Sequence, residues 1–190
     1  MRWDNIEILP VSTREQLREW LMKNHKVARE AWIIMSRKPK KGTILYLDIV
    51  EEALCFGWID GINKKLDEKT HVQRITPRKS NNWTELNKER VRRLERIGLM
   101  TDAGRAVLPD MSTENFIIAS EIWKEIRDDE KVLKNFKSFP ALYIRVRIGN
   151  IQQEIKHPIV YKRRLNKFLD MTREGRMYGA WNDDGKLLNE

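Results

Sequence analysis

The residue types that could form a ligand site gather between Gly57 and Asn87. The segment Gly57-Trp58-Ile59-Asp60-Gly61 supplies an indole and a carboxylate, and the chain beyond it supplies cations, a second indole and an amide. The candidate ligand-binding residues are Trp58, Asp60, Arg74, Arg78, Lys79, Trp83 and Asn87. A carboxylate, planar guanidinium groups and indole faces together suit a flat or anionic ligand.

Each member of this set has a role that its chemistry suggests. Asp60 would accept a hydrogen bond from the ligand or act as a general base, and Arg78 would clamp an anion. Trp83 would offer a stacking face and Asn87 a hydrogen bond. A structural interpretation stands beside this one. Asp60 would then pair with Arg74 or Arg78 to brace a hairpin, while Trp58 and Trp83 pack in the core.

Other kinds of active site lack their characteristic residues. The three histidines, His25, His71 and His157, are far apart in sequence, and none has a His or Cys partner at metal-ligand spacing. No glycine-rich phosphate loop and no nucleophile elbow is present. The single cysteine, Cys55, lies among apolar residues, and we expect it to be a buried thiol with a raised pKa. We therefore expect no catalytic residue, no metal and no cofactor.

The positive charge of the chain is concentrated in one segment. The formal net charge is +9, and residues 131–169 hold ten basic side chains against one acid, Glu154. The candidate anion-binding residues in this segment are Arg145, Arg147, Lys156, Lys162, Arg163, Arg164 and Lys167. Such asymmetry indicates an anionic partner. The alternative is a solvated helical surface that maintains solubility.

The first half of the chain alternates between helical and extended patterns. Ser12-Thr13-Arg14-Glu15 has the pattern of a capping box, which starts a helix. Two extended runs around residues 67–70 predict a hairpin. The predicted helices are 13–24, 47–56, 84–97 and a short one from Thr101 to Pro109, and the predicted strands are 31–35, 58–66 and 71–76.

The second half is helical by pattern. Residues 116–127 and 159–173 read as helices, and the acids of 128–130 suit the start of another. Residues 141–149 fit both a strand and a helix, and the spacing of Ile144, Ile148 and Ile151 favours the helix. The Gly- and Asn-rich tail from Tyr178 is expected to fray.

These patterns predict an α+β fold. A small antiparallel sheet with helices would occupy residues 1–110, and a basic, all-helical region would occupy residues 111–190. Hydrophobic residues make up 41% of the chain, which is enough for a packed core. No apolar stretch approaches the ~20 residues that a membrane helix needs, and the N-terminal residues MRWDNIEILP do not resemble a secretory signal.

Four motifs between Val50 and Gly104 resemble one known family. They read VEEALCFGWIDGI from Val50, QRITPRK from Gln73, WTELNKERVRRL from Trp83 and GLMTDAG from Gly98. In this order they are similar to the YdeI/OmpD-associated family, the bacteriocin-protection proteins of bacteria. The C-terminal residues Phe139-Pro140, Tyr143, Lys156, Tyr161 and Arg163-Arg164 are similar to the helical end of that family.

The resemblance implies a non-enzymatic stress-protection or bacteriocin-protection protein with a protein or anionic partner. The family name implies association with an outer-membrane porin. Two other functions remain open from the residues: binding of nucleic acid or another polyanion by the basic C-terminal helices, and binding or turnover of a small molecule in the Asp/Arg/Trp pocket. One cysteine and the lack of a signal predict a cytoplasmic protein with no membrane span.

Overall fold

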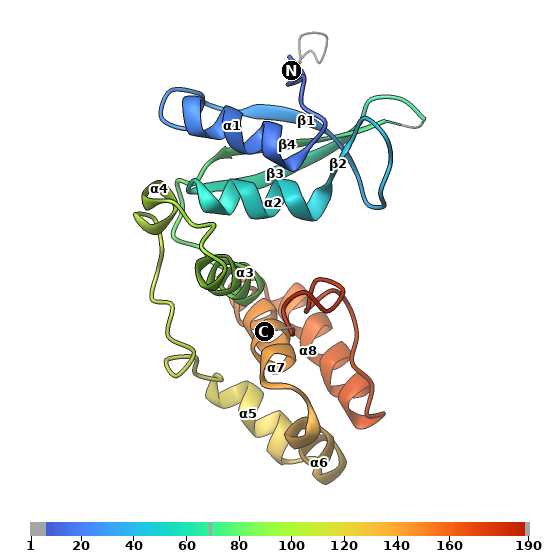
Figure 1. Ribbon diagram of the computed structural model, residues 1–190. Helices are drawn as coiled ribbons and strands as arrows, with labels where there is room; N and C mark the ends of the chain where they lie inside the picture. The colour runs from blue at the N-terminus through green and yellow to red at the C-terminus, as the bar shows by residue number, and fades with distance from the viewer. Residues whose placement is uncertain (1–6, 69, 189–190) are drawn as a thin grey trace. The chain divides into compact units, whose positions relative to one another are not determined.

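The computed structural model describes residues 7–68 and 70–188, and the chain forms two compact units (Figure 1). Unit 1 comprises Met1–Asn82 and Arg90–Pro109, and unit 2 comprises Trp83–Glu89 and Asp110–Glu190. The helical second region therefore begins one residue before the predicted boundary and gains residues 83–89. Most of the N-terminal segment assessed as a possible signal, residues 1–6, lies outside the described residues, as does Lys69 in the predicted hairpin loop.

Unit 1 contains a four-stranded sheet in the order β2-β1-β4-β3. Its strands are β1 (Ala31–Ser36), β2 (Ile44–Leu45), β3 (Trp58–Lys65) and β4 (His71–Pro77). The predicted hairpin is confirmed, because β3 and β4 pair antiparallel, with a bulge between Asp60 and Asn63. β1 also pairs antiparallel with β4.

The predicted small antiparallel sheet is present in β1, β4 and β3, and β2 adds a parallel strand at its edge, so the sheet as a whole is mixed. β2 runs parallel to β1, with Met35 opposite Ile44. The loop of residues 37–43 brings the chain back to the edge of β1 before β2 begins, and it contains Gly42, whose φ of 77° is in the left-handed region. β2 has only two residues, and so short a strand has no periodicity by which a sequence could predict it.

Helices α1 (Arg14–Asn24) and α2 (Tyr46–Cys55) lie side by side against the sheet (Figure 1). The capping box of α1 lies one residue later than predicted. The Thr13 side chain accepts from the backbone of Gln16, and the Gln16 side chain accepts from the backbone of Thr13. α2 is buried from Ile49 through Cys55, because it contacts α1 as well as the sheet.

The remaining helices of unit 1 contact α2 near its C-terminal end. α3 (Glu85–Arg96) places its residues from Arg90 onward in unit 1, and α4 (Asp102–Arg105) is capped by Thr101. The helix predicted up to Pro109 is therefore a single turn. A Cβ on Gly104 would overlap the Cys55 carbonyl, so only glycine lets α4 approach α2 this closely.

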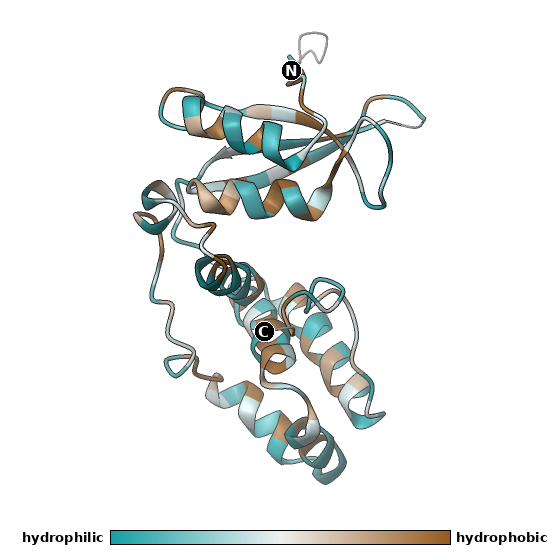
Figure 2. Ribbon diagram, viewed as in Figure 1, coloured by the Kyte–Doolittle hydropathy of each residue, from teal (hydrophilic) through white to brown (hydrophobic). Residues whose placement is uncertain are grey.

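Four helices make up most of unit 2, which confirms a helical C-terminal part. They are α5 (Ser120–Arg127), α6 (Glu130–Ser138), α7 (Ala141–Gln152) and α8 (Pro158–Arg173). The helical interpretation of the ambiguous segment is confirmed by α7. α5 begins four residues later than predicted. Hydrophobic and hydrophilic residues alternate around these helices (Figure 2), and their apolar sides form the core.

The C-terminal tail packs instead of fraying. Trp181 and Leu187 are buried in the core of unit 2. The Trp181 ring lies edge-on to Tyr143 at 5.5 Å between centroids, and Tyr178 contacts Tyr143 in the same way at 6.4 Å. The expectation of fraying followed the glycines and asparagines of the tail, but its aromatic residues bury enough apolar area to order it.

Candidate anion-binding site

In unit 1, Asp60 has a partner that the sequence analysis did not include. The Tyr46 hydroxyl, in the first turn of α2, donates to Asp60 Oδ2 on β3 at 2.6 Å. Burial and the negative charge of Asp60 raise the pKa of Tyr46, so this phenol stays protonated and acts as a donor. Nothing in the spacing of the two residues identifies the pair, since the packing of α2 on β3 brings them together.

The predicted cations around Asp60 divide between different partners. Burial lowers the pKa of Arg78, and the negative charge of Asp60 opposes that effect, so the two groups lie within electrostatic reach. Arg78 also donates to the Asn82 carbonyl at 3.0 Å. Arg74 pairs with Glu30, at 2.5 Å between Nη2 and Oε2. Lys79 is exposed in the loop after β4.

The indoles and the amide of the predicted site are buried. Trp58 is 1% exposed, donates to the His25 carbonyl and packs edge-on against Trp20. In unit 2, Trp83 and Asn87 are 7% and 8% exposed. Trp58 belongs to the core of unit 1, and Trp83 is largely covered, so little of either indole is available to solvent for stacking.

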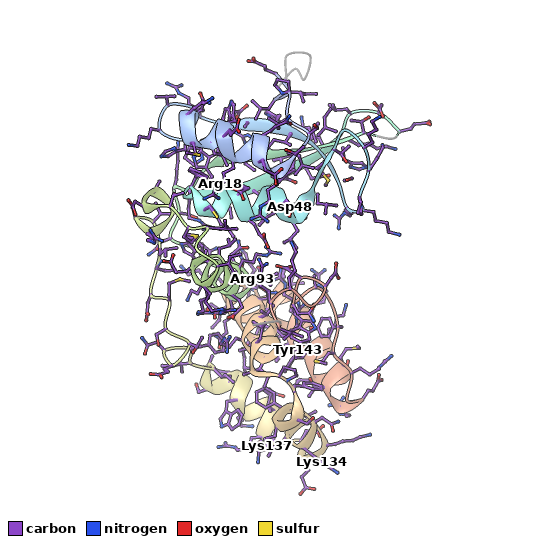
Figure 3. All side chains as sticks on the ribbon, in the orientation of Figure 1. Arg18, Asp48, Arg93, Lys134, Lys137 and Tyr143 are labelled. Carbon is purple, nitrogen blue, oxygen red and sulfur yellow. The ribbon has the colours of Figure 1, made fainter. Side chains whose placement is uncertain are left out.

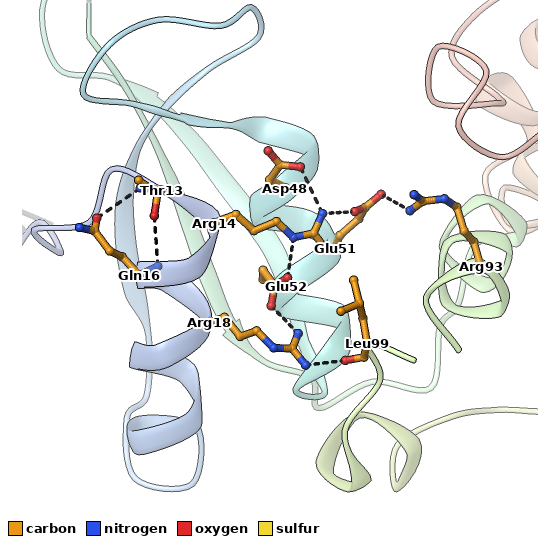
Figure 4. A network of polar contacts seen from close by, with 9 residues as sticks. All are labelled: Thr13, Arg14, Gln16, Arg18, Asp48, Glu51, Glu52, Arg93 and Leu99. Atoms are coloured by element: carbon orange, nitrogen blue, oxygen red, sulfur yellow. Dashed lines mark hydrogen bonds and ion pairs between the residues drawn. The ribbon is translucent and has the colours of Figure 1, made fainter. Parts of the chain in front are cut away.

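Unit 1 contains a buried network of charged side chains that the sequence analysis did not predict (Figure 4). Arg14 of α1 binds Glu51 at 2.6 Å and Glu52 at 2.7 Å. Arg18 binds Glu52 at 2.9 Å, and Arg93 of α3 binds Glu51 at 3.2 Å. Both glutamates have side chains only 1% exposed. Buried carboxylates need such partners, because an isolated charge in the interior is costly.

The network ties three helices together through their polar groups. Arg14 also reaches Asp48 at 3.3 Å, and Arg18 donates to the Leu99 carbonyl at 2.8 Å. Figure 3 labels its members Arg18, Asp48 and Arg93 on unit 1. The signal in the sequence was the presence of three acids, Asp48, Glu51 and Glu52, within one turn of an otherwise apolar helix. Acids are unusual in a buried helix unless they are paired.

Cys55 lies at the end of this helix and is fully buried. Burial and the nearby charge of Glu52 raise the pKa of its thiol to about 12. The expected burial of Cys55 is confirmed, and a thiol held in its protonated form is a poor nucleophile. Within residues 7–68 and 70–188, no cluster of three or more His, Cys, Asp or Glu residues could hold a metal ion.

Unit 2 contains a basic pocket of about 600 Å³. Its lining combines cations from two helices with polar groups and one tyrosine. The lining residues are Thr84, Arg147, Asn150, Ile151, Gln153, Glu154, Arg163, Arg164, Lys167 and Tyr178. Four of these described residues are cationic and one, Glu154, is acidic. We call this site the basic pocket.

The positions of two arginines in the basic pocket are fixed by the protein itself. Arg147 donates to the Ala180 carbonyl at 2.5 Å and lies over the ring of Tyr178, 5.1 Å from its centroid. Arg164 donates to the Asn150 carbonyl at 2.6 Å and pairs with Glu154 at 3.1 Å. These contacts place positive charge before any ligand arrives, which lowers the entropic cost of binding.

The other two cations are less restrained. Arg163 and Lys167 are exposed and lie one turn apart on α8. Lys167 lies 4.9 Å above the Tyr178 ring, and neither Arg163 nor Lys167 pairs with an acid within residues 7–68 and 70–188. Glu154 is shared by Arg164 and His157. The basic pocket therefore retains an excess of positive charge.

The structure brings four of the seven predicted anion-binding residues together. Arg147, Arg163, Arg164 and Lys167 line the basic pocket. Arg145 instead pairs with Glu89 at 3.0 Å within unit 2, and its side chain is 16% exposed. Lys156 and Lys162 are exposed outside the lining. Sequence reasoning missed Tyr178 because it belongs to the tail that was expected to fray.

Residues 9–107 match the DUF8412 family, a domain of unknown function. The match spans half of the chain, so the chain belongs to this family. The match encloses the four motifs from which the YdeI/OmpD-associated family was predicted, and that prediction stays untested. The basic pocket lies outside the match except for Thr84. No curated protein and no solved structure matches the chain. None of the helices described is both long enough and apolar enough to cross a membrane.

Proposed function

We propose that this is a non-enzymatic binding protein that holds an anionic partner in the basic pocket of unit 2. One observation carries the proposal: four cations from α7 and α8 converge on a pocket that contains a single acid. That acid, Glu154, is already engaged by Arg164 and His157. Such a site attracts anions and has little to repel them.

The cost of this arrangement supports a binding role. Arg163 and Lys167 are like charges one turn apart, and such pairs destabilise a helix. A bound anion would remove that repulsion. The role in bacteriocin or stress protection that the family resemblance implies would then be exerted in the cytoplasm, through binding of a protein or another anionic partner.

Nucleic acid is the second candidate partner, and exposed lysines outside the basic pocket favour it. Lys134 and Lys137 lie on α6 (Figure 3) and are exposed, as are Lys156 and Lys162. A polymer could contact several of these cations at once, whereas a compact anion would use only those in the basic pocket.

A binding assay with a matched charge control tests the proposal. We would measure binding of fluorescent heparin and a labelled single-stranded 20-mer, at low and moderate salt, to the protein and to two double variants. Arg163→Gln/Lys167→Gln removes two charges from the basic pocket, and Lys134→Gln/Lys137→Gln removes two from α6.

We expect the pocket variant to lose about tenfold in affinity and the α6 variant to lose much less. Equal losses would show that net charge, and not the basic pocket, determines binding. Failure of the unmodified protein to bind either probe at low salt would refute binding of an extended polyanion, and failure to bind compact anions as well would refute the proposed function.

A further inference from the structure

The size of the basic pocket limits which anion it can accept. Its volume of about 600 Å³ lies within the range of small-molecule sites, which is roughly 300–1,000 Å³. The four cations line this one pocket. A compact ligand can reach all four together, whereas one phosphate of a polymer can satisfy only part of the set.

The spacing of the cations indicates more than one anionic group. Arg163 and Lys167 are four residues apart on α8, which puts their Cβ atoms about 5–6 Å apart. Arg147 comes from α7 and is held against Tyr178 by the tail. Charges that arrive from two helices suit a ligand whose own charges are spread over neighbouring groups, as in a chain of phosphates.

Guanidinium, hydroxyl and ammonium groups of the basic pocket can donate hydrogen bonds to such a ligand. The guanidinium groups of Arg147 and Arg164 can each give further N–H bonds, because five donors are present and few are used. Thr84 Oγ1 accepts from the Asn87 backbone at 3.1 Å, which leaves its hydroxyl proton free to donate. Arg163 and Lys167, which are exposed, can close onto the ligand from solvent.

The tail completes the pocket and links it to the fold. Gly179 has a φ of 70°, and a Cβ there would stand 2.8 Å from Arg147 Nη1. The backbone of the tail thus passes directly over the guanidinium of Arg147, and Ala180 accepts its hydrogen bond. A glycine at this position lets the tail hold Arg147 without displacing it into the pocket.

From these observations we infer that the basic pocket takes a compact ligand with two or more linked phosphate groups, held by Arg147, Arg163, Arg164 and Lys167. This inference rests on the proposed function and narrows its ligand. The shared chemistry is the oligophosphate, which occurs both in nucleoside di- and triphosphates and in short inorganic polyphosphates.

Isothermal titration of the full chain with ATP, ADP, AMP, adenosine and inorganic tripolyphosphate tests the inference, at low and moderate salt without divalent cations. We expect ADP and ATP to bind at least about tenfold more tightly than AMP, and adenosine not to bind. If tripolyphosphate binds with the same affinity as ATP, the ligand is assigned as inorganic polyphosphate. If ATP binds clearly more tightly, the ligand is assigned as a nucleotide.

The same two double variants separate the pocket from the general charge. Arg163→Gln/Lys167→Gln should lose about tenfold or more in affinity for ADP or tripolyphosphate, with Lys134→Gln/Lys137→Gln close to unchanged. Far-UV circular dichroism would verify that both fold. A third variant, Gly179→Ala, should weaken binding by displacing Arg147.

Three outcomes would overturn the inference in different ways. If heparin or the 20-mer binds but ATP, ADP and tripolyphosphate do not, the ligand is an extended polyanion and the proposed function survives. If no anion binds at low salt, the inference and the proposed function both fail. Equal affinity for AMP and ADP would show that linked phosphates are not what the basic pocket recognises.

Discussion

The Tyr46 hydroxyl donates a 2.6 Å hydrogen bond to the Asp60 carboxylate, and this bond joins α2 to β3. The negative charge of Asp60 contributes to the raised pKa of Tyr46, which keeps the donor proton in place. Asp60 therefore has a structural partner within unit 1, in addition to the electrostatic influence of Arg78. The contribution of the Tyr46–Asp60 hydrogen bond to stability can be measured separately from any role of Asp60 in binding.

A double-mutant cycle of Tyr46→Phe and Asp60→Ala should give a coupling free energy of about 1.5–3 kcal/mol, the range for hydrogen bonds to charged groups. Urea unfolding followed by circular dichroism measures it. Asp60→Asn should fold, because the amide oxygen still accepts from Tyr46. Strictly additive single and double variants would show that the bond contributes nothing to stability.

Glu52→Gln should destabilise unit 1 by about 1.5–3 kcal/mol, because Arg14 and Arg18 lose the charge of the buried carboxylate that they share, although Arg14 keeps Glu51. Denaturant unfolding measures the change. Glu95→Gln is the matched control, since Glu95 pairs with Arg105 on the surface and both side chains are nearly half exposed. A loss no larger than that of the control would mean that the buried network is dispensable.

Alkaline pH should destabilise the protein in part through Cys55. Burial raises the pKa of its thiol from 9.0 to about 12, so the folded state retains a proton that the unfolded state releases. The protonated thiol therefore contributes fully to the free energy of unfolding below pH 9. This contribution is lost as the pH rises to 12, and it amounts to at most about 4 kcal/mol.

Unfolding free energies of the protein and of Cys55→Ala, measured from pH 8 to pH 11, should therefore show a shallower decline in the variant. Burial also raises the pKa values of Tyr46 and Tyr143. Their contributions to the unfolding free energy change with pH equally in both proteins and therefore cancel in the comparison. Parallel curves would contradict a contribution from the thiol.

Trp181→Ala should destabilise unit 2 by about 3–5 kcal/mol, the usual cost of removing a buried aromatic side chain. The ring packs on Tyr143, so near-ultraviolet circular dichroism should also change. Leu188→Ala, at a tail position that is half exposed, should have little effect. If both variants unfold like the parent, the tail does not contribute to the core.

Local patterns in the sequence sufficed for most secondary structure. The predicted helix at 13–24 and the hairpin are present, and the ambiguous segment 141–149 is helical. These elements were predictable because capping residues and periodicity act over a few neighbouring positions. The two-residue strand β2 was not predictable, since its pairing with β1 depends on the path of the loop between them.

The sequence by itself determined that the positive charge lies in the second half and that Cys55 would be buried. Only the tertiary structure decided which cations meet. It placed Arg147 with Arg163, Arg164 and Lys167 in the basic pocket, and it paired Arg145 with Glu89. The physical reason is that charge and burial follow from local composition, whereas convergence depends on how helices distant in sequence pack against one another.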